Sequence, residues 1–392
     1  MSIDKKSLIE QFKGKSWEDL PTPSLVLDVD RFKSNCDNLT ACANKLKVPL
    51  RCHVKTHKTT EGLRLQLANQ EYGGGRVLVS TIPEARAILP LVKEGIVKDV
   101  CYSIPIPKSR LADCEELAQE IPDFRLLVDD IAQLDLLGTS KQTYSVFVKI
   151  DMGYGRAGLT PESPRLLEVF KRIKSYDNVN LFGLYCHSGS AYTALNKDEA
   201  REYLFKEVSV ATKAARIART VGFEDLTLSV GSTPTAHAVE ILDDGNLPPV
   251  EGHLEIHAGN YPCCDLQQVA TGCVSLEQVA VSVVAEIVST YPGRGTGPGE
   301  QLIDAGVLSL ARETSKIAGY GKLADNDDWI VGRISQEHGI LTTENEKAQF
   351  LEYGTKIKIL PQHACISCAS FPYYFILKDG KIDDVWVPAK WW

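Results

Sequence analysis

A lysine between two histidines is the first feature of this sequence that could do chemistry. The segment RCHVKTHK at residues 51–58 places Lys55 between His53 and His57, with another lysine just behind. Lysine is rarely buried, yet residues 48–54 are typical of a buried strand that runs into a loop. Burial and neighbouring cations lower the pKa of an amine and make it a nucleophile. Lys55 is therefore either a solvated surface residue or a tuned amine.

Two small turns in the second half of the chain could hold a phosphate group. In LSVGSTPTAH (228–237), Thr233 follows a strand and a glycine. In HAGNY (257–261), Gly259 and Asn260 offer backbone N–H groups. Neighbouring turns of this kind form phosphate sites in barrels, although two ordinary turns are the alternative interpretation.

A histidine and two cysteines lie close together in PQHACISC (361–368). His363 and Cys365 are two residues apart, so they point to the same face if this segment is a strand. One imidazole and one thiolate leave zinc with open coordination positions, as in catalytic sites. The spacing of Cys365 and Cys368 also fits a redox pair, and a purely structural role is the third interpretation.

The elements that must position these residues are short apolar strands that alternate with helix-sized segments. This rhythm predicts parallel strands with crossover helices, and eight such units favour a (β/α)8 TIM barrel. Polar residues follow the C-terminal ends of several strands, where the active sites of barrels lie. The predicted strands are 24–30, 48–54, 76–80, 97–104, 124–130, 144–151, 181–189 and 226–231.

The pattern changes from about residue 276, where strands follow one another without long helices. We therefore predict a barrel over residues 21–275, and an antiparallel β domain over 276–392 together with 1–20. The β domain carries His363 and Cys365. A glycine run without the spacing of a dinucleotide loop, and an Asp-Gly pair, predict hairpin connections. These connections lie at 293–299 and 379–380.

Composition argues against several classes of function. The 392 residues carry a formal net charge of -8 and no long basic run, so we expect no nucleic-acid partner. We expect no membrane helix and no signal peptide, because apolar stretches are short and the start of the chain is polar. The 11 cysteines are odd in number and irregularly spaced, which favours reduced thiols and a cytoplasmic protein.

Seven motifs occur in an order that resembles a known family. They are PTPSLVLD, RCHVKTHK, DMGYGRAGL, YCHSGSAY, VGSTPT, HAGNY and PQHACIS, and they span nearly the whole chain. Together they resemble the eukaryotic-type D-serine dehydratases, which are related to D-threonine aldolases and more distantly to alanine racemase. These are fold-type III pyridoxal phosphate enzymes, built as a barrel followed by a β domain.

The resemblance implies roles for individual residues. Lys55 corresponds to the lysine that forms the Schiff base with pyridoxal 5'-phosphate, in a partly cationic surround of His53, His57 and Lys58. Other positions correspond to ligands of the cofactor phosphate, to contacts of its ring, to a cation at its pyridine nitrogen, and to a zinc pair. They are Thr233, Gly259, Asn260 and Tyr192 for the phosphate, Tyr185 and His187 for the ring, Arg156 for the nitrogen, and His363 with Cys365 for Zn2+.

The implied reaction is β-elimination of D-serine to pyruvate and ammonia, with D-threonine as a second substrate. Zinc acts in it as a Lewis acid on the leaving hydroxyl group. The alternative is retro-aldol cleavage of D-3-hydroxy amino acids, as in D-threonine aldolases. A cofactor carrier and a thiol redox protein are further interpretations, and they account less well for the β domain and the metal pair. The resemblance also implies a homodimer.

Overall fold

The computed structural model describes residues 3–242 and 247–392. The chain folds as two compact units, and each is considered by itself. In neither unit does a helix of the described residues combine the length and the apolar character that a membrane crossing requires. Unit 1 contains the chain up to Cys36 and Asn260–Lys390, and unit 2 contains Asp37–Gly259 with Trp391–Trp392.

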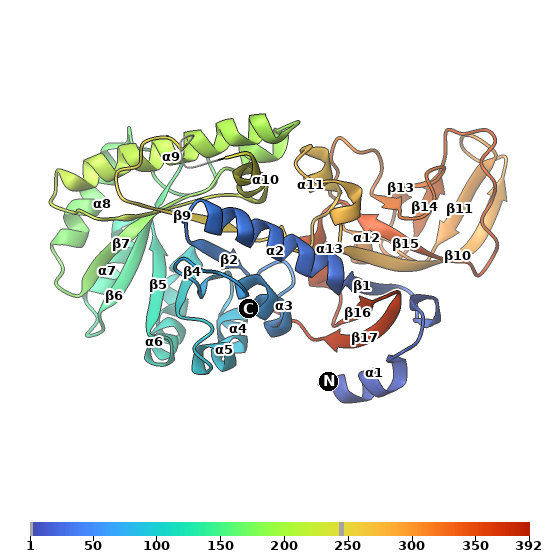
Figure 1. The fold of residues 1–392 in the computed structure, drawn as a ribbon, viewed down its shortest axis with the longest axis horizontal. Coiled ribbons are helices and arrows are strands. Elements are labelled where there is room, and N and C mark those ends of the chain that lie inside the picture. The colour runs from blue at the N-terminus through green and yellow to red at the C-terminus, as the bar shows by residue number, and fades with distance from the viewer. Residues whose placement is uncertain (1–2, 243–246) are drawn as a thin grey trace. The chain divides into compact units, whose positions relative to one another are not determined.

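Unit 2 is a closed barrel of eight parallel strands with helices around its outside (Figure 1). The strands follow in chain order, and the last pairs with the first, with Leu50 opposite Ile256. This confirms the predicted (β/α)8 TIM barrel. The strands are β2 (Leu50–His53), β3 (Arg76–Val79), β4 (Asp99–Pro105), β5 (Asp123–Val128), β6 (Tyr144–Ile150), β7 (Val179–Cys186), β8 (Thr227–Val230) and β9 (His253–Ala258).

The barrel differs from the prediction in its first and last strands. Residues 24–30 are predicted as a barrel strand, but β1 (Ser24–Asp28) pairs with β10 (Val281–Pro292) and β16 (Tyr374–Lys378) in unit 1. The barrel is closed instead by β9, which the sequence pattern does not predict. β1 is a short apolar run, and such a run has the same sequence pattern in a barrel as in another sheet. β9 is harder to recognise as a buried strand, because it carries two histidines and a buried glutamate. The predicted barrel limits, 21–275, are accordingly wider than unit 2.

Polar side chains cap several helices of unit 2. Thr59, Thr81 and Asn196 each accept a backbone N–H at the start of α3 (Thr60–Leu67), α4 (Ile82–Ala87) and α9 (Lys197–Arg219). These caps fix the loops that leave the C-terminal ends of the strands. The other helices are α2 (Val29–Lys45), α5 (Leu89–Lys93), α6 (Leu111–Glu120), α7 (Ile131–Gly138), α8 (Pro164–Lys174) and α10 (Thr233–His237), with 3-10 turns η2 (Lys108–Arg110), η3 (Ser190–Thr193) and η4 (Ala238–Ile241).

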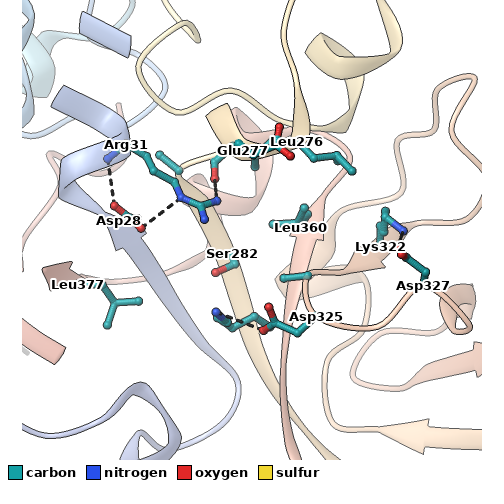
Figure 2. Close-up of a pocket in the computed structure, with 14 residues that line it drawn as sticks. Asp28, Arg31, Leu276, Glu277, Ser282, Lys322, Asp325, Asp327, Leu360 and Leu377 are labelled. Carbon is teal, nitrogen blue, oxygen red and sulfur yellow. Dashed lines mark hydrogen bonds and ion pairs between the residues drawn. The ribbon is translucent and has the colours of Figure 1, made fainter. Parts of the chain in front are cut away.

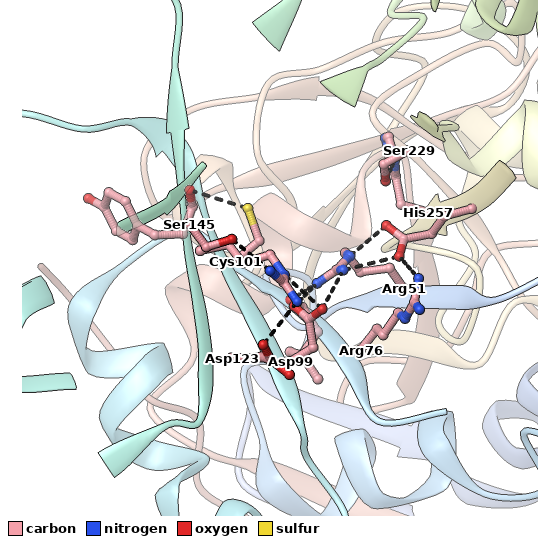
Figure 3. Close-up of polar contacts among 12 residues, drawn as sticks. Arg51, Arg76, Asp99, Cys101, Asp123, Ser145, Ser229 and His257 are labelled. Atoms are coloured by element: carbon pink, nitrogen blue, oxygen red, sulfur yellow. Dashed lines mark hydrogen bonds and ion pairs between the residues drawn. The ribbon is translucent and has the colours of Figure 1, made fainter. Parts of the chain in front are cut away.

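A buried ion cluster lies in the interior of the barrel (Figure 3). Arg51 of β2 is fully buried, and its Nε donates to Glu255 Oε1 of β9 at 2.6 Å. Its Nη1 donates to Asp99 Oδ1 of β4 at 2.6 Å. Arg76 donates to Glu255, and Arg125 donates to Asp99. Removing one member would leave a buried charge unpaired, so the cluster specifies the register of the strands that carry it.

Unit 1 is built on a nine-stranded sheet. Its neighbouring strands are antiparallel, except for the parallel pair β1 and β16. Its other strands are β11 (Gly299–Ile303), β12 (Gly321–Leu323), β13 (Ile330–Ile334), β14 (Gly339–Thr342), β15 (Lys356–Pro361) and β17 (Lys381–Trp386). Because β11 pairs with both β14 and β10, the sheet closes on itself over part of its width. The predicted antiparallel β domain is confirmed in this form.

Both predicted hairpins are present in unit 1. Residues 293–299 connect β10 to β11, and a two-residue turn connects β16 to β17. Asp379 has a φ of 50° and Gly380 a φ of 75°, as a tight hairpin turn requires. The helices of this unit are α1 (Lys5–Phe12), α11 (Leu266–Ala270), α12 (Val307–Leu310) and α13 (Ala364–Ser370), with 3-10 turns η1 (Trp17–Asp19) and η5 (Leu276–Gln278).

A pocket of about 310 Å³ opens on the sheet of unit 1 (Figure 2). It is lined by residues of β1, β10, β12, β15 and β16 and by the segments beside them. Its cations are each paired with a carboxylate of the lining: Arg31 with Asp28, Lys358 with Asp325, and Lys322 with Asp327. The lining contains none of the residues that the sequence singles out for chemistry.

Candidate active site

The loop after β2 presents Lys55 at the end of the barrel where the strands finish. β2 ends at His53, and the Lys58 N–H donates to the Val54 carbonyl at 2.8 Å, which closes a turn around Lys55. Lys55 is exposed. Within the described part of the chain, its amine has neither a hydrogen-bond partner nor an ion-pair partner. This amine is therefore available to react with a carbonyl compound.

Lys58, by contrast, is held by a buried carboxylate. Its Nζ lies 2.9 Å from Glu84 Oε1, and Glu84 Oε2 accepts the Ser80 N–H at 2.7 Å. Glu84 is buried on α4, just after β3. The ion pair engages the Lys58 amine, whereas the Lys55 amine has no such partner among the described residues, so the geometry favours Lys55 over Lys58 as the nucleophile.

The two histidines of this segment are buried and neutral. Burial, and then the charge of Lys55, lowers the pKa of His53 well below its usual value. Burial lowers the pKa of His57 to about 4. The two histidines are therefore polar but neutral parts of the expected surround, and Lys58 is its ion-paired amine. His53 instead makes a neutral hydrogen bond, with its Nε2 3.2 Å from Ser80 Oγ.

Three aromatic side chains stack at the ends of β7 and β9. The rings of Tyr185 and His257 lie 4.1 Å apart and 12° from parallel, and the His187 ring lies 6.1 Å from His257. His187 Nδ1–H donates to the Gly231 carbonyl at 2.7 Å, which leaves Nε2 as the acceptor nitrogen. Burial, and then the charge of Lys149, lowers the pKa of His187 well below its usual value. Neutral, flat side chains of this kind suit an aromatic cofactor ring.

The sequence patterns do not predict two candidates in this region, His257 and Lys149. His257 opens the HAGNY motif and is buried, and its Nε2 has no partner among the described residues. Lys149 of β6 is buried with its Nζ 4.3 Å from the centre of the Tyr185 ring, and burial lowers its pKa to about 8. In the sequence, the only sign of Lys149 as a site residue is that it lies within the apolar run YSVFVKI. Strand periodicity alone does not distinguish a lysine with a function from one that is simply tolerated in the core.

The predicted phosphate residues follow the neighbouring strands β8 and β9. Thr233 is buried at the start of α10, and Gly259 follows β9 directly. A Cβ on Gly231 would lie 2.1 Å from the His257 carbonyl oxygen, and one on Gly259 would lie 3.0 Å from His53 Cβ. Both turns therefore keep a bare backbone, as a phosphate cradle requires. An available amine, a neutral aromatic stack and this cradle fit pyridoxal phosphate.

Three predicted cofactor residues lie in the segments that follow β6, β7 and β9. Tyr192 lies in η3 and is 37% exposed. Arg156 is exposed in the loop after β6, with its guanidinium 5.8 Å from the Tyr154 ring. Asn260 belongs to unit 1, where its side-chain amide donates to Asp265. The roles of Arg156, Tyr192 and Asn260 in cofactor binding stay predictions.

His363 and Cys365 of unit 1 lie at the start of α13, and not on a strand. β15 ends at Pro361, and His363 is the N-cap residue of the helix. The two side chains contact each other nonetheless, because an N-cap residue and the second helical residue share the first turn. Burial lowers the pKa of His363, but a hydrogen bond to Cys365 and the charges of Cys365, Asp265 and Glu313 raise it to about 9.

This surround of His363 suits a cation. His363 Nδ1 lies 3.5 Å from Glu313 Oε1. Imidazole and thiolate are ligands that zinc prefers, so the chemistry of the pair fits zinc. In the part of the chain that the structure describes, no group of three or more His, Cys, Asp or Glu side chains is arranged to hold a metal ion. His363 and Cys365 are therefore an open pair, that is, two ligands that would leave the other coordination positions of a metal ion open.

The chain combines a parallel barrel, whose first strand leads to an available lysine, with an antiparallel sheet unit. This combination defines the alanine racemase class of proteins. Residues 27–245 match the family model described as alanine racemase, N-terminal domain. Residues 280–377 match the model described as putative serine dehydratase domain. The first matched segment lies mainly in unit 2, and the second lies in unit 1.

Individual relatives narrow this class. The chain is 42% identical to D-serine dehydratase from Schizosaccharomyces pombe, over 100% of this chain and 97% of that protein. It is 36% identical to D-serine dehydratase from Saccharomyces cerevisiae, with 98% and 99% covered. D-threo-3-hydroxyaspartate dehydratase from Delftia sp. HT23 has a similar structure, with a TM-score of 0.85 at 27% identity over 96% of this chain and 100% of that one. A mutant of the latter protein is described in a metal-free form. This chain belongs to the D-serine dehydratase family, and the family implies pyridoxal phosphate as cofactor.

Proposed function

We propose that this protein is a lyase that converts D-serine to pyruvate and ammonia by β-elimination. The available Lys55 amine at the C-terminal end of a barrel strand carries the proposal. It is supported by 42% identity to a protein named D-serine dehydratase. When bound, pyridoxal phosphate supplies an electron sink for negative charge at the substrate Cα.

Lys55 holds the cofactor and moves the proton at the substrate Cα. This assignment is supported by its exposure and by the engagement of Lys58 with Glu84. Because His53 and His57 have lowered pKa values, they leave Lys55 as the amine that exchanges protons in this segment. A single base takes a proton from one face of the substrate, so the reaction is specific for D-amino acids.

The remaining cofactor contacts come from the ends of the barrel strands. The turns at Gly231 and Gly259, whose backbones are bare, support a phosphate site there. The stacked rings support a ring site beside them. In this proposal Thr233, Gly259, Asn260 and Tyr192 bind the phosphate, Tyr185, His187 and His257 line the ring, and Arg156 faces the pyridine nitrogen.

His363 and Cys365 hold Zn2+ in this proposal. Their donor types and their mutual contact support it. Zinc supplies a Lewis acid, which assists the departure of a hydroxyl group as a leaving group. A thiolate ligand favours zinc over harder ions such as Mg²⁺ or Mn²⁺.

We also propose a homodimer that works in the cytoplasm. Leu308 of α12 is 51% exposed and Ile366 of α13 is 41% exposed, and these two helices are in contact. Exposed apolar side chains on neighbouring helices are a surface of the kind that a second copy covers. All 11 cysteines are free, which fits a reducing compartment. Sedimentation that showed a fully active 43.1 kDa monomer would contradict the dimer.

The reaction is tested by incubating the purified, cofactor-loaded protein with D-serine, L-serine or D-threonine and measuring pyruvate. We expect pyruvate from D-serine and none from L-serine. Glycine and acetaldehyde from D-threonine, without pyruvate from D-serine, would assign the retro-aldol reaction instead. Comparable turnover of L-serine would contradict the assignment of a single base.

A further inference from the structure

A fully buried carboxyl group lies behind the site loops and takes no part in the proposed reaction. Glu207 is on α9, which packs against β7 and β8, and its exposed fraction is 0%. Its Oε1 accepts the Ser188 N–H at 2.6 Å. Its Oε2 makes no well-formed hydrogen bond among the described residues, although two nearby donors act on the carboxyl group. A glutamate is rarely buried so completely, and it therefore calls for an explanation.

Glu207 fixes the backbone beside His187. Ser188 directly follows His187, so the hydrogen bond from its N–H to Glu207 anchors the backbone beside the imidazole. On the other side, His187 Nδ1–H donates to the Gly231 carbonyl. The N–H of Gly231 in turn stabilises the Glu207 carboxylate. The carboxyl group thus ties the loop after β7 to the loop after β8.

The loop after β8 depends on the same carboxyl group through Thr235. The Thr235 hydroxyl stabilises the Glu207 carboxylate, and its oxygen accepts the Ser232 N–H at 2.8 Å. Thr233, the proposed phosphate ligand, lies between Ser232 and Thr235 in this capped turn. A change at residue 207 would therefore reach His187 through Ser188, and Thr233 through the capped turn.

The carboxyl group acts through its shape and its acceptor oxygen more than through its charge. Burial raises the pKa of Glu207 to about 8, even though the Ser188 N–H and the Thr235 hydroxyl lower it. The group is therefore largely protonated at neutral pH. A glutamine at this position has the same shape and keeps an acceptor oxygen, whereas an alanine or a leucine has none.

We propose that Glu207 is a positioning residue, which holds the His187 ring against Gly231 and the turn of Thr233 in the geometry that the cofactor needs. The inference rests on the proposed function only for the identity of the cofactor. It assigns Glu207 no contact with reacting atoms. Its effect is exerted through Ser188, Gly231 and Thr235.

The first experiment observes His187 itself and needs neither cofactor nor substrate. In protein labelled with 15N-histidine, NMR should show a hydrogen-bonded imidazole N–H that disappears in His187→Phe, which assigns it. We expect Glu207→Gln to keep this signal and Glu207→Ala to lose it or move it upfield. Glu202→Ala is the control, because Glu202 is exposed on the same helix.

The second experiment measures the dissociation constant of pyridoxal phosphate. We expect Glu207→Ala to weaken binding about tenfold or more, and Glu207→Gln and Glu202→Ala to stay within about twofold. Where the alanine variant does not fold, Glu207→Leu fills the same space without an acceptor and should show the same losses. An unchanged His187 signal and unchanged cofactor affinity in a folded alanine or leucine variant would overturn the proposal. Neither readout depends on D-serine turnover, so the outcome is separate from that of the proposed function.

Discussion

The ammonium group of Lys58 lies 2.9 Å from Glu84 Oε1, whereas the amine of Lys55, three residues earlier, has no partner among the described residues. The two lysines look much alike in the sequence, where each lies within two residues of a histidine. The fold separates them because Glu84 is carried to this point by the next strand and helix of the barrel. The ion pair holds the turn in which the free amine is presented.

We predict that borohydride reduction of the cofactor-loaded protein attaches the cofactor to Lys55. The reducible bond needs an amine that is free to attack a carbonyl group, and the Lys58 amine is engaged by the Glu84 carboxylate. Peptide mapping by mass spectrometry locates the label. Lys55→Ala should abolish labelling, while Lys58→Met should retain it. Label on Lys58 in the wild-type protein would refute the assignment.

We predict that Glu84→Gln lowers the free energy of unfolding by about 3 kcal/mol, because it leaves the part-buried Lys58 charge without its partner. Urea unfolding at neutral pH measures this change. Glu94→Gln is the matched control, since it breaks the exposed pair of Glu94 with Arg64 and should leave stability close to that of the wild type. Equal effects of the two substitutions would show that burial of the pair is unimportant.

Much of the fold could be predicted because the alternation of short apolar strands with helix-sized segments is a local property. The error over β1 and β9 arose where the pattern is not local. Ser24–Asp28 has the composition of a barrel strand, and only its partners β10 and β16 place it in the sheet. β9 looks too polar for a buried strand, because Glu255 is there to pair with Arg51 across the barrel.

The candidate site likewise depends on features that are not local in the sequence. Lys55 stands out in the sequence because two histidines flank it, but their lowered pKa values depend on burial, which the spacing does not show. Lys149 and Glu207 are invisible to motif reasoning, since each is one polar residue in an otherwise regular element. His363 and Cys365 would share a face on a strand, but the helix α13 begins between them. Their contact comes from the first turn of that helix.

We predict that His57 makes the protein less stable in mild acid. Its pKa is lowered to about 4 by burial, from an ordinary value of 6.5. Below 6.5 the unfolded chain binds a proton that the folded chain does not, so stability falls as the pH drops from 6.5 towards 4, and it is unaffected above that range. At about pH 5 the loss from this residue is about 2 kcal/mol.

The test compares the free energy of unfolding at about pH 7.5 and about pH 5 in urea, where each protonated buried histidine adds to the pH dependence. The difference between the two values should be about 2 kcal/mol smaller in His57→Asn than in the wild type. His338→Asn is the control, because His338 is exposed. A pH dependence that is identical in His57→Asn and the wild type would show that His57 is already charged in the folded protein.

Finally, we predict that the open pair of His363 and Cys365 binds zinc and is required for D-serine turnover. A chelator should abolish pyruvate formation, and zinc should restore it better than manganese, because a thiolate ligand favours zinc. His363→Ala and Cys365→Ala should each lose metal content and activity. Both variants should still bind pyridoxal phosphate, since Lys55 belongs to the barrel of unit 2 and the pair to unit 1.

Cys368→Ala separates the metal pair from the thiols around it. Cys368 is fully buried and lies one helical turn from Cys365, so it resembles the pair in sequence but differs from it in exposure. Its replacement should lower stability slightly, through lost packing, while metal content and activity stay near the wild-type values. Metal content is measured by atomic absorption and activity by pyruvate release. Loss of zinc in Cys368→Ala, with zinc retained in Cys365→Ala, would place the metal on the other cysteine. Full activity after complete removal of metal would contradict a Lewis-acid role, because the hydroxyl group would then leave without the help of a metal ion.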